Sequence, residues 1–428
     1  MSATLYHNAR LIDPASGRDE PGGLLVEDDR IADLGPNVTA DSAAMVDCGG
    51  HVLCPGLVDM MAFVSEPGEG SLTTASRAAA AGGVTTLTVM PNTTPPLDNI
   101  ALVEFIARRA RDTAIVNIHP MAAATKGLAG AEMSEIGLLL KAGAVAFTDG
   151  RKAVASARLM DRLLTYATAF DALVVQHVED PELARGGCIN QGELATRLGL
   201  PGIPVEAETV LLERDLRLAA RAGARYHAAQ LTCAQSLGVI RHAKAARARV
   251  SCGVAPQHFA LNENAIGEYR TFAKTSPPLR CEEDRQAVAE ALADGTIDVI
   301  VSAHDPQSEE NKRQPFAQAA DGVAGLETML PLALELYHAG QAPLMRVLEA
   351  MTARPADLIG LPAGRLAAGA PADLLVFDLD TPWRIDTSRL HSKAKNSPYD
   401  GRPVQGRVLR TIVGGETVFT ANGFQDAP

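Results

Sequence analysis

Short apolar runs recur along the middle of the chain, and many of their residues are β-branched. A continuous apolar run is typical of a strand buried on both faces, because a half-solvated strand alternates apolar and polar positions. Alanine- and leucine-rich stretches with helical spacing separate the runs, as at 71–81, 99–111 and 285–293. The eight runs occupy residues 56–63, 84–90, 114–119, 142–148, 172–178, 224–231, 248–254 and 298–304.

Strand–helix alternation repeated this often predicts an α/β protein built on a (β/α)8 TIM-type barrel. Both ends of the chain instead show short strands and turns, as at 5–11, 23–27, 30–34, 52–54, 372–377, 408–413 and 417–419. Neither end is long enough for a core of its own, so we expect them to meet in one small composite β-sandwich. The predicted parts are 1–55 (N-terminal part of the sandwich), 56–350 (barrel) and 351–428 (a helix and the C-terminal part of the sandwich).

The composition narrows the class of protein without naming an activity. Of 428 residues, 46% are hydrophobic and 21% are charged, as in an ordinary globular protein. The net charge of −12 argues against non-specific nucleic-acid binding. The six cysteines form no C-x-x-C, the first residues have no signal pattern, and no apolar run could cross a bilayer. We therefore expect a cytoplasmic protein with reduced thiols and no membrane or nucleic-acid partner.

The carboxyl ends of the predicted strands are where a barrel of this type carries its chemistry. At the first strand end, a His-x-His pair would place two imidazoles on one face, where both could bind one metal ion. This chain has Met61 and Phe63 there, and no His-x-His occurs anywhere in it. The other strand ends bring Asn92, Asp149, His177, Gln230, Ala303 and His304 into consideration.

Several phrases of the sequence resemble dihydroorotase in their order and wording. They are VDMMAFVSEPG from Val58, MPNTTPP from Met90, AVAFTDG from Ala144, HVED from His177, SPPLR from Ser276, GLETMLPLALELYH from Gly325, TARPADLIGL from Thr352, APADLLVFD from Ala370 and SKAKNSPYDG from Ser392. Dihydroorotases belong to the amidohydrolase superfamily of metal-dependent barrels with a composite β-sandwich. The resemblance covers nearly the whole chain and implies this fold, a zinc cofactor and a place in pyrimidine biosynthesis.

The departures from the family pattern concern the metal site. The resemblance implies metal ligands or the general base at four positions, which here hold Met61, Phe63, Gln230 and Ala303. It also implies an arginine for a substrate carboxylate where this chain has Ser65. The residues retained as a vestigial pocket are Asn92, Asp149, His177 and His304. We therefore predict no catalytic residue, no metal and no cofactor, with the family zinc lost.

Without the metal, a cyclic-amide hydrolase loses its low-pKa water and the polarised carbonyl. The sequence analysis accordingly favours a protein that is not an enzyme. The resemblance then implies a non-catalytic dihydroorotase-like subunit of pyrimidine biosynthesis. Its expected partner is the catalytic chain of aspartate carbamoyltransferase, and a homo-oligomer is expected as well.

Two alternatives stay open. One is a dihydroorotase or related cyclic-amide hydrolase with a degenerate mononuclear metal site on Asp149, His177 and His304. The other is a sensor that binds a pathway metabolite through Asn92 and His304. The simplest structural roles are a packed barrel mouth for Met61 and Phe63, a turn for Asn92, and a charged solvated loop for residues 308–313.

Overall fold

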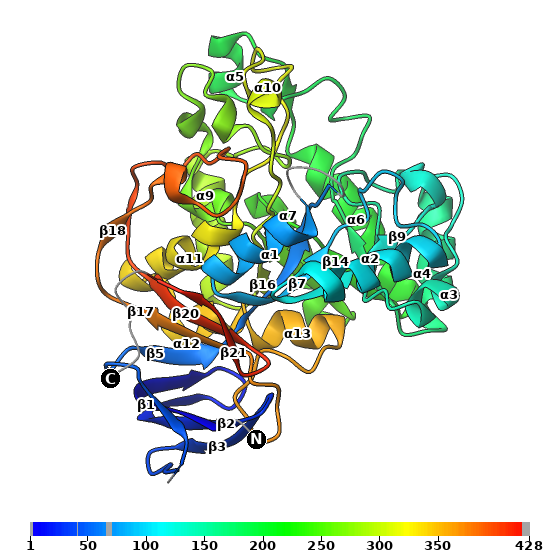
Figure 1. Cartoon of the computed structure of the whole chain (residues 1–428). Helices are drawn as coiled ribbons and strands as arrows, with labels where there is room; N and C mark the ends of the chain where they lie inside the picture. Colours follow the sequence, from blue (N-terminus) through cyan, green and yellow to red (C-terminus); the bar gives the residue numbers. More distant parts are fainter. Residues whose placement is uncertain (1–2, 41, 66–70, 422–428) are drawn as a thin grey trace.

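The computed structural model describes residues 3–40, 42–65 and 71–421 and confirms the predicted fold class (Figure 1). The barrel strands are β6 (Leu57–Ala62), β7 (Val84–Val89), β8 (Asn117–Pro120) continued by β9 (Ala122–Ala123), β10 (Phe147–Thr148), β11 (Leu173–Gln176), β14 (Arg225–Ala228), β15 (Val250–Val254) and β16 (Val299–Ile300). They pair in parallel in the orders β6-β7-β8 and β9-β10-β11-β14-β15-β16. A parallel bridge between Ala62 and His304 joins the first strand to the segment after the last.

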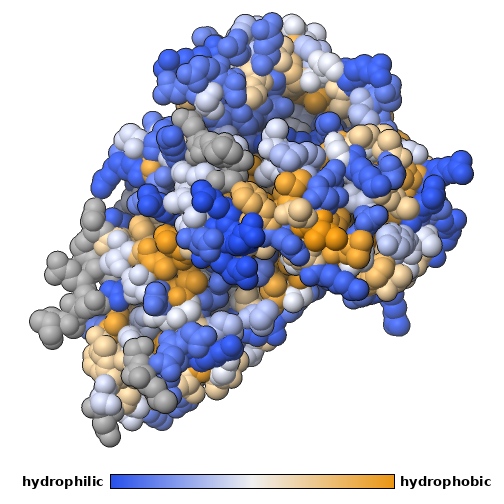
Figure 2. Space-filling view, turned by 45° about the vertical axis from the view of Figure 1, so that its right-hand side comes forward, coloured by the Kyte–Doolittle hydropathy of each residue, from blue (hydrophilic) through white to orange (hydrophobic). Residues whose placement is uncertain are grey.

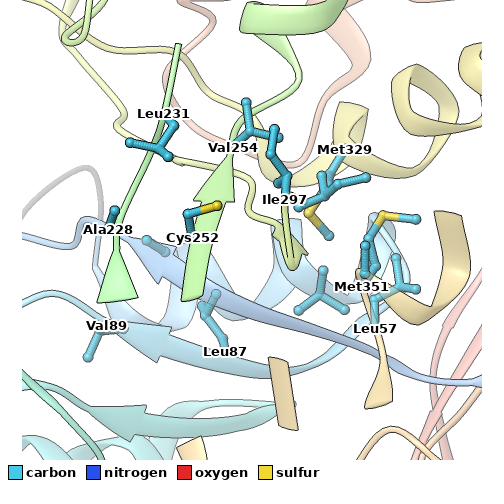
Figure 3. Packing of buried hydrophobic residues seen from close by; sticks show 14 of the residues in the cluster. Leu57, Leu87, Val89, Ala228, Leu231, Cys252, Val254, Ile297, Met329 and Met351 are labelled. Atoms are coloured by element: carbon cyan, nitrogen blue, oxygen red, sulfur yellow. The ribbon is translucent and has the colours of Figure 1, made fainter. Parts of the chain in front are cut away.

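Helices surround the barrel because its strands are apolar on their outer face as well. The helices around it are α1 (Leu72–Ala81), α2 (Ile100–Thr113), α3 (Ile136–Lys141), α4 (Ala157–Thr168), α6 (Glu206–Ala222), α7 (Ala234–Ala245), α9 (Glu282–Ala293), α11 (Met329–His338), α12 (Leu344–Glu349) and α13 (Ala353–Ile359). Ser71 and Asn99 cap α1 and α2 by accepting a backbone N–H with their side chains. Figure 3 shows the resulting layer, in which Leu57, Leu87 and Val254 of the strands pack near Met329 and Met351.

Both ends of the chain enter one mixed sheet below the barrel, as the sequence predicts (Figure 1). Its eight strands are β1 (Ala3–Asp13), β2 (Arg18–Glu27), β3 (Arg30–Gly35), β4 (Ala44–Asp47), β5 (Val52–Pro55), β17 (Leu374–Asp378), β20 (Arg407–Val413) and β21 (Glu416–Thr420). The join is the antiparallel pairing of β5 with β17, which buries Leu53 against Val376. The core beneath this sheet takes residues from both ends of the chain, so neither terminal segment alone carries enough apolar residues to form it.

The third barrel strand runs further than the sequence pattern indicates. The predicted run over 114–119 overlaps β8, which ends at Pro120, and β9 then resumes the pairing with β10. Pro120 cannot donate to the ladder, yet its carbonyl accepts the Val145 N–H at 3.1 Å and the strand continues. The strand therefore delivers Thr125, rather than His119, to the barrel mouth.

Loops that follow β11, β15 and β16 build a small cap over one side of the mouth, at the top of Figure 1. Its elements are β12 (Ile189–Asn190), α5 (Glu193–Leu198), β13 (Gly202–Ile203), α8 (Gln257–Ala260), η2 (Glu263–Ile266), η3 (Thr271–Ala273) and α10 (Glu309–Lys312). They share an apolar cluster that includes Ile189, Leu279 and Phe316. The remaining short elements are η1 (Lys126–Leu128), η4 (Leu326–Thr328), β18 (Trp383–Arg384), η5 (Thr387–Arg389) and β19 (Pro403–Val404).

Residues 308–313 are only partly the solvated loop that their charges predict. Lys312 is buried, and its ammonium group donates to the carbonyls of Thr271 and Lys274 at 3.1 and 3.3 Å. Ser308 caps the short helix α10. The segment is therefore anchored to the cap by its lysine.

Two further expectations concern the whole chain. Across the ranges given above, no helix combines the length and apolar character needed to span a membrane. All six cysteines are free thiols, and only Cys281 is not fully buried.

Candidate functional site at the barrel mouth

A cavity of about 250 Å³ opens where the barrel strands end. Its lining comes from β6 and from loops after β10, β11, β14, β15 and β16. The residues are Met61, Phe63, Arg151, His177, Glu179, Gln230, Gln257, Thr275, Ser276, Ala303, Asp305, Asp321, Gly322 and Val323. Five of the predicted site residues are thus brought together: Met61, Phe63, His177, Gln230 and Ala303.

A buried polar chain fills the floor of this cavity. The Gln230 side chain donates from Nε2 to the Met61 thioether at 3.2 Å, and its Oε1 lies 3.1 Å from His258 Nε2. All three residues are buried. Burial lowers the pKa of His258 to about 3, so its imidazole is neutral at physiological pH. Gln230 is therefore a satisfied packing residue in this arrangement.

One wall of the cavity is formed by Phe63, Arg151 and Asp305. The Arg151 guanidinium lies 3.9 Å from the centroid of the Phe63 ring. Its Nε donates to Asp305 Oδ2 at 3.0 Å, and an Nη donates to Oδ1 of the same carboxylate. Burial raises the pKa of Asp305, and the charge of Arg151 opposes that rise.

His177 presents its imidazole to the cavity between Ser276 and Glu179. Its Nε2 lies 3.4 Å from Ser276 Oγ and 3.7 Å from Glu179 Oε1. Burial opposes ionisation of Glu179, but the contact with His177 and the charge of Arg280 hold its pKa below the usual range. An ionised carboxylate therefore lies beside an imidazole at the wall of the cavity.

Asn92 and Asp149 lie behind the cavity wall rather than in it. Asp149 accepts the backbone N–H of Thr125 at 2.9 Å and also its hydroxyl, and burial raises its pKa. Asn92 donates to the Asp149 carbonyl at 3.3 Å and packs on Gly150, where its side chain occupies the space that a Cβ would need. The φ of Gly150 is 66°, a conformation that favours glycine. The two residues hold the turn that presents Arg151.

His304 lies at the closure of the barrel and does not line the cavity. Its carbonyl accepts the Phe63 N–H at 2.7 Å. Its side chain is 2% exposed, and burial lowers its pKa to about 4. Its Nδ1 has no hydrogen-bond partner among the residues that the structure describes. A neutral imidazole is therefore enclosed in the packing.

The residues at the mouth do not fit the family zinc. Zinc needs three or four nitrogen, sulfur or oxygen ligands in tetrahedral geometry. Among the four replaced positions, Met61 offers a thioether that accepts a hydrogen bond from Gln230, and Gln230 itself offers an amide. The other two positions hold the phenyl ring of Phe63 and the methyl group of Ala303. A guanidinium rests on the phenyl ring and would repel a divalent cation. In the part of the chain that the structure describes, no group of three or more His, Cys, Asp or Glu side chains could hold a metal ion.

Comparisons with known proteins place the chain in a family. A family model described as Dihydro-orotase-like matches residues 50–236, and one described as Amidohydrolase family matches residues 338–419. A dihydroorotase of Anaplasma phagocytophilum (strain HZ) is 46% identical over 426 residues, which is 97% of this chain and 95% of the relative. The chain belongs to the dihydroorotase family. A dihydroorotase of Syntrophus aciditrophicus (strain SB) is 40% identical, covering 97% of this chain and 99% of the relative.

Solved structures agree with the dihydroorotase family fold. The L-hydantoinase (dihydropyrimidinase) of Arthrobacter aurescens aligns with a TM-score of 0.89 and 27% identity, covering 98% of this chain and 96% of that one. A dihydropyrimidinase of Brevibacillus agri NCHU1002 aligns with a TM-score of 0.85 at 20% identity, covering 98% and 95% of the two chains, and shows the shared fold alone.

These comparisons correct one prediction from the sequence. The expectation that the chain is not an enzyme is wrong, because relatives over the full length are named dihydroorotase and the structural neighbours are hydrolases. The four replaced side chains do not outweigh a relationship that spans the full length of the chain.

Sequence reasoning also missed Arg151 as a cavity residue. Its only local signal is its place directly after the Asp149-Gly150 turn that follows the fourth barrel strand. Asp305 has no local signal either, because its pairing with Arg151 crosses 154 positions of the chain.

Proposed function

We propose that this chain is a cyclic-amide hydrolase of pyrimidine metabolism that acts on dihydroorotate or a closely related cyclic ureide. One observation carries the proposal: the His177–Glu179 pair faces the cavity of a barrel whose full-length relatives are named dihydroorotase. The proposal includes that the site works without zinc, since the residues at the mouth do not offer a ligand set.

In this proposal His177 is the general base. The imidazole accepts a proton from a water molecule as the water oxygen bonds to the amide carbonyl carbon. Glu179 stabilises the imidazolium that forms, because its carboxylate is ionised beside the ring. The imidazolium of His177 then gives this proton to the amide nitrogen of the substrate as the bond between that nitrogen and the carbonyl carbon breaks. The product is the open-chain carbamoyl acid. General-base assistance of this kind contributes a rate factor of roughly 10² to 10⁴.

The test is a ring-opening assay with dihydroorotate on the purified protein, with added zinc in one arm and a chelator in another. We expect slow turnover that neither addition changes. His177→Ala should lower kcat about 100-fold, while His242→Ala, at an exposed histidine of α7, should leave kcat unchanged. Turnover at the level of buffer alone would refute the proposal, and stoichiometric bound zinc would refute its metal-free part.

A second role, assembly with the catalytic chain of aspartate carbamoyltransferase, is supported by an exposed apolar surface. We define the apolar patch as Ile100, Leu138, Tyr166 and Phe170, which are 39%, 43%, 37% and 41% exposed. Figure 2, turned so that the side with α2, α3 and α4 comes forward, shows apolar residues among the charged ones.

The members of the apolar patch are neighbours. Ile100 and Leu138 line one surface hollow. The rings of Tyr166 and Phe170 meet edge to face with their centroids 5.3 Å apart, and Phe170 packs on Gly137. Contiguous exposed apolar surface is a mark of protein interfaces. Co-expression with the carbamoyltransferase and size-exclusion chromatography test the assembly. Two separate peaks at micromolar concentration would refute it.

A further inference from the structure

We infer that Arg151 is the residue that selects carboxylate-bearing ligands at the barrel mouth. The inference rests on the proposed function, because it assigns the ligand class of the same cavity. Among the residues that the structure describes, Arg151 supplies the one lysine or arginine side chain that lines this cavity. Its side chain is 43% exposed, so the guanidinium is accessible to a small molecule entering the mouth.

The guanidinium is held in place before any ligand arrives. The Phe63 ring supports one face of the guanidinium at 3.9 Å, and Asp305 accepts two of its N–H groups. Asp305 is itself fixed by Gln307, whose Nε2 donates to it at 2.8 Å. Arginine has five N–H donors in a planar fork. Three of them have no bond to a described residue and are available for a carboxylate.

The carboxylates of the cavity do not exclude an anion, because each has a cationic or imidazole neighbour. Asp305 pairs with Arg151, and Asp321 lies 3.9 Å from the buried ammonium of Lys274. Glu179 lies beside His177. The charges of Lys312 and Lys274 also act on Asp321 from behind the wall. The remaining donors of Arg151 are therefore the most favourable place for an incoming carboxylate.

The cavity also limits what can accompany the carboxylate. At about 250 Å³ it admits a molecule of one ring or a short chain. Gln257 and Thr275 add polar groups to a lining that is otherwise partly apolar, as at Met61 and Val323. A small acid that carries an amide or ureide group fits this lining, with its carboxylate on Arg151.

The test measures binding by isothermal titration calorimetry with three probes: dihydroorotate and N-carbamoyl-L-aspartate, which carry carboxylates, and uncharged hydantoin. We expect Arg151→Gln to weaken binding of both acids at least tenfold and to change hydantoin binding less than twofold. Asp305→Asn should tighten binding of the acids, because it removes a negative charge and, with one acceptor oxygen left, frees one donor of Arg151. Lys152→Gln is the matched control, since it removes an exposed positive charge at the next position, and it should change binding less than twofold.

Equal binding of dihydroorotate to the Arg151→Gln variant and the unmodified protein would overturn the inference. So would a failure of the unmodified protein to bind either acid. If Arg151→Gln does not fold, Arg151→Lys replaces it, and an intermediate loss is expected because the charge remains and the fork is lost. The proposed hydrolysis fails separately: tight, Arg151-dependent binding without turnover would refute the hydrolase and leave this inference standing.

Discussion

At the scale of single residues, Asp59 shows how the barrel mouth is held together. This fully buried carboxylate in β6 accepts the backbone N–H groups of Ser302 and Met61 at 2.9 and 3.1 Å, and also the Ser302 hydroxyl. It thereby ties the first barrel strand to the segment after the last. Burial raises its pKa from 3.8 to about 6 although these bonds oppose the rise.

The raised pKa of Asp59 predicts a pH-dependent stability. The pKa of Asp59 is higher in the folded protein than in the unfolded chain. Its contribution to the free energy of unfolding is therefore complete below about pH 4 and is lost as the pH rises through 6. A difference of about two units corresponds to about 3 kcal/mol. Asp59→Asn keeps an acceptor oxygen and cannot ionise. Its free energy of unfolding, relative to the unmodified protein, should therefore rise by up to that amount between pH 4 and 7.5 in urea titrations.

Asp112→Asn, at an exposed carboxylate of α2, serves to subtract the general effect of removing one charge. A stability difference between Asp59→Asn and the unmodified protein that stays constant from pH 4 to 7.5 would contradict the prediction.

Ala303 carries backbone strain that a glycine would relieve. Its φ is 45°, in the left-handed region where a Cβ is crowded. Ala303→Gly should therefore stabilise the protein by about 0.5–1 kcal/mol, less whatever the buried methyl group contributes. The matched exchange Ala324→Gly, at a buried alanine without a positive φ, should destabilise it by about 0.4–1 kcal/mol. Chemical denaturation measures both variants, and a loss of stability at Ala303 as large as the loss at Ala324 would contradict the strain.

At the scale of elements, the cap depends on the docking of α10 through Lys312. Lys312→Met keeps the aliphatic stem but leaves the carbonyls of Thr271 and Lys274 without this donor. Each carbonyl keeps one backbone donor, the Lys274 N–H or the Gly322 N–H, so the variant loses hydrogen bonds to a charged group. Such bonds contribute about 1.5–3 kcal/mol, and we therefore expect α10 to open more often. Hydrogen exchange should rise in residues 309–320 and stay unchanged in the barrel strands.

Arg313→Met is the control for Lys312, because Arg313 is 78% exposed and its pair with Glu309 lies at the surface. Exchange in α10 should not respond to it. Equal exchange in the Lys312 and Arg313 variants would mean that the ammonium does not anchor the helix.

The contrast between barrel and cap explains what the sequence could predict. Barrel strands such as β7 and β15 are buried on both faces, so their apolar runs are visible in the chain itself. The cap elements are two to six residues long and are stabilised by one another, so no local periodicity marks them. The Arg151–Asp305 pair has no sequence pattern either, because it forms only when the fourth and eighth barrel strands become neighbours of one cavity.

At the scale of the whole molecule, the same limit applies to function. The positions where the family resemblance implies metal ligands or the general base hold Met61, Phe63, Gln230 and Ala303. These four replacements alone do not decide whether the chain is an enzyme, because other side chains also line the cavity. His177, Glu179 and Arg151 form a different set of charged and titratable groups at the mouth of the same barrel. Function therefore has to be argued from the assembled cavity and from the family together.

The apolar patch gives the last prediction, which concerns assembly. If the catalytic chain of aspartate carbamoyltransferase docks there, Ile100→Asp combined with Leu138→Asp should abolish co-elution, because two carboxylates would be buried without partners. Val210→Asp is the control: Val210 is 53% exposed on α6, outside the patch, and its replacement should leave the complex intact. Size-exclusion chromatography with light scattering reads out both cases. A complex that survives the double exchange would place the interface elsewhere. If the complex survives but the homo-oligomer of the double variant is smaller than that of the unmodified protein, the patch binds a second copy of this chain.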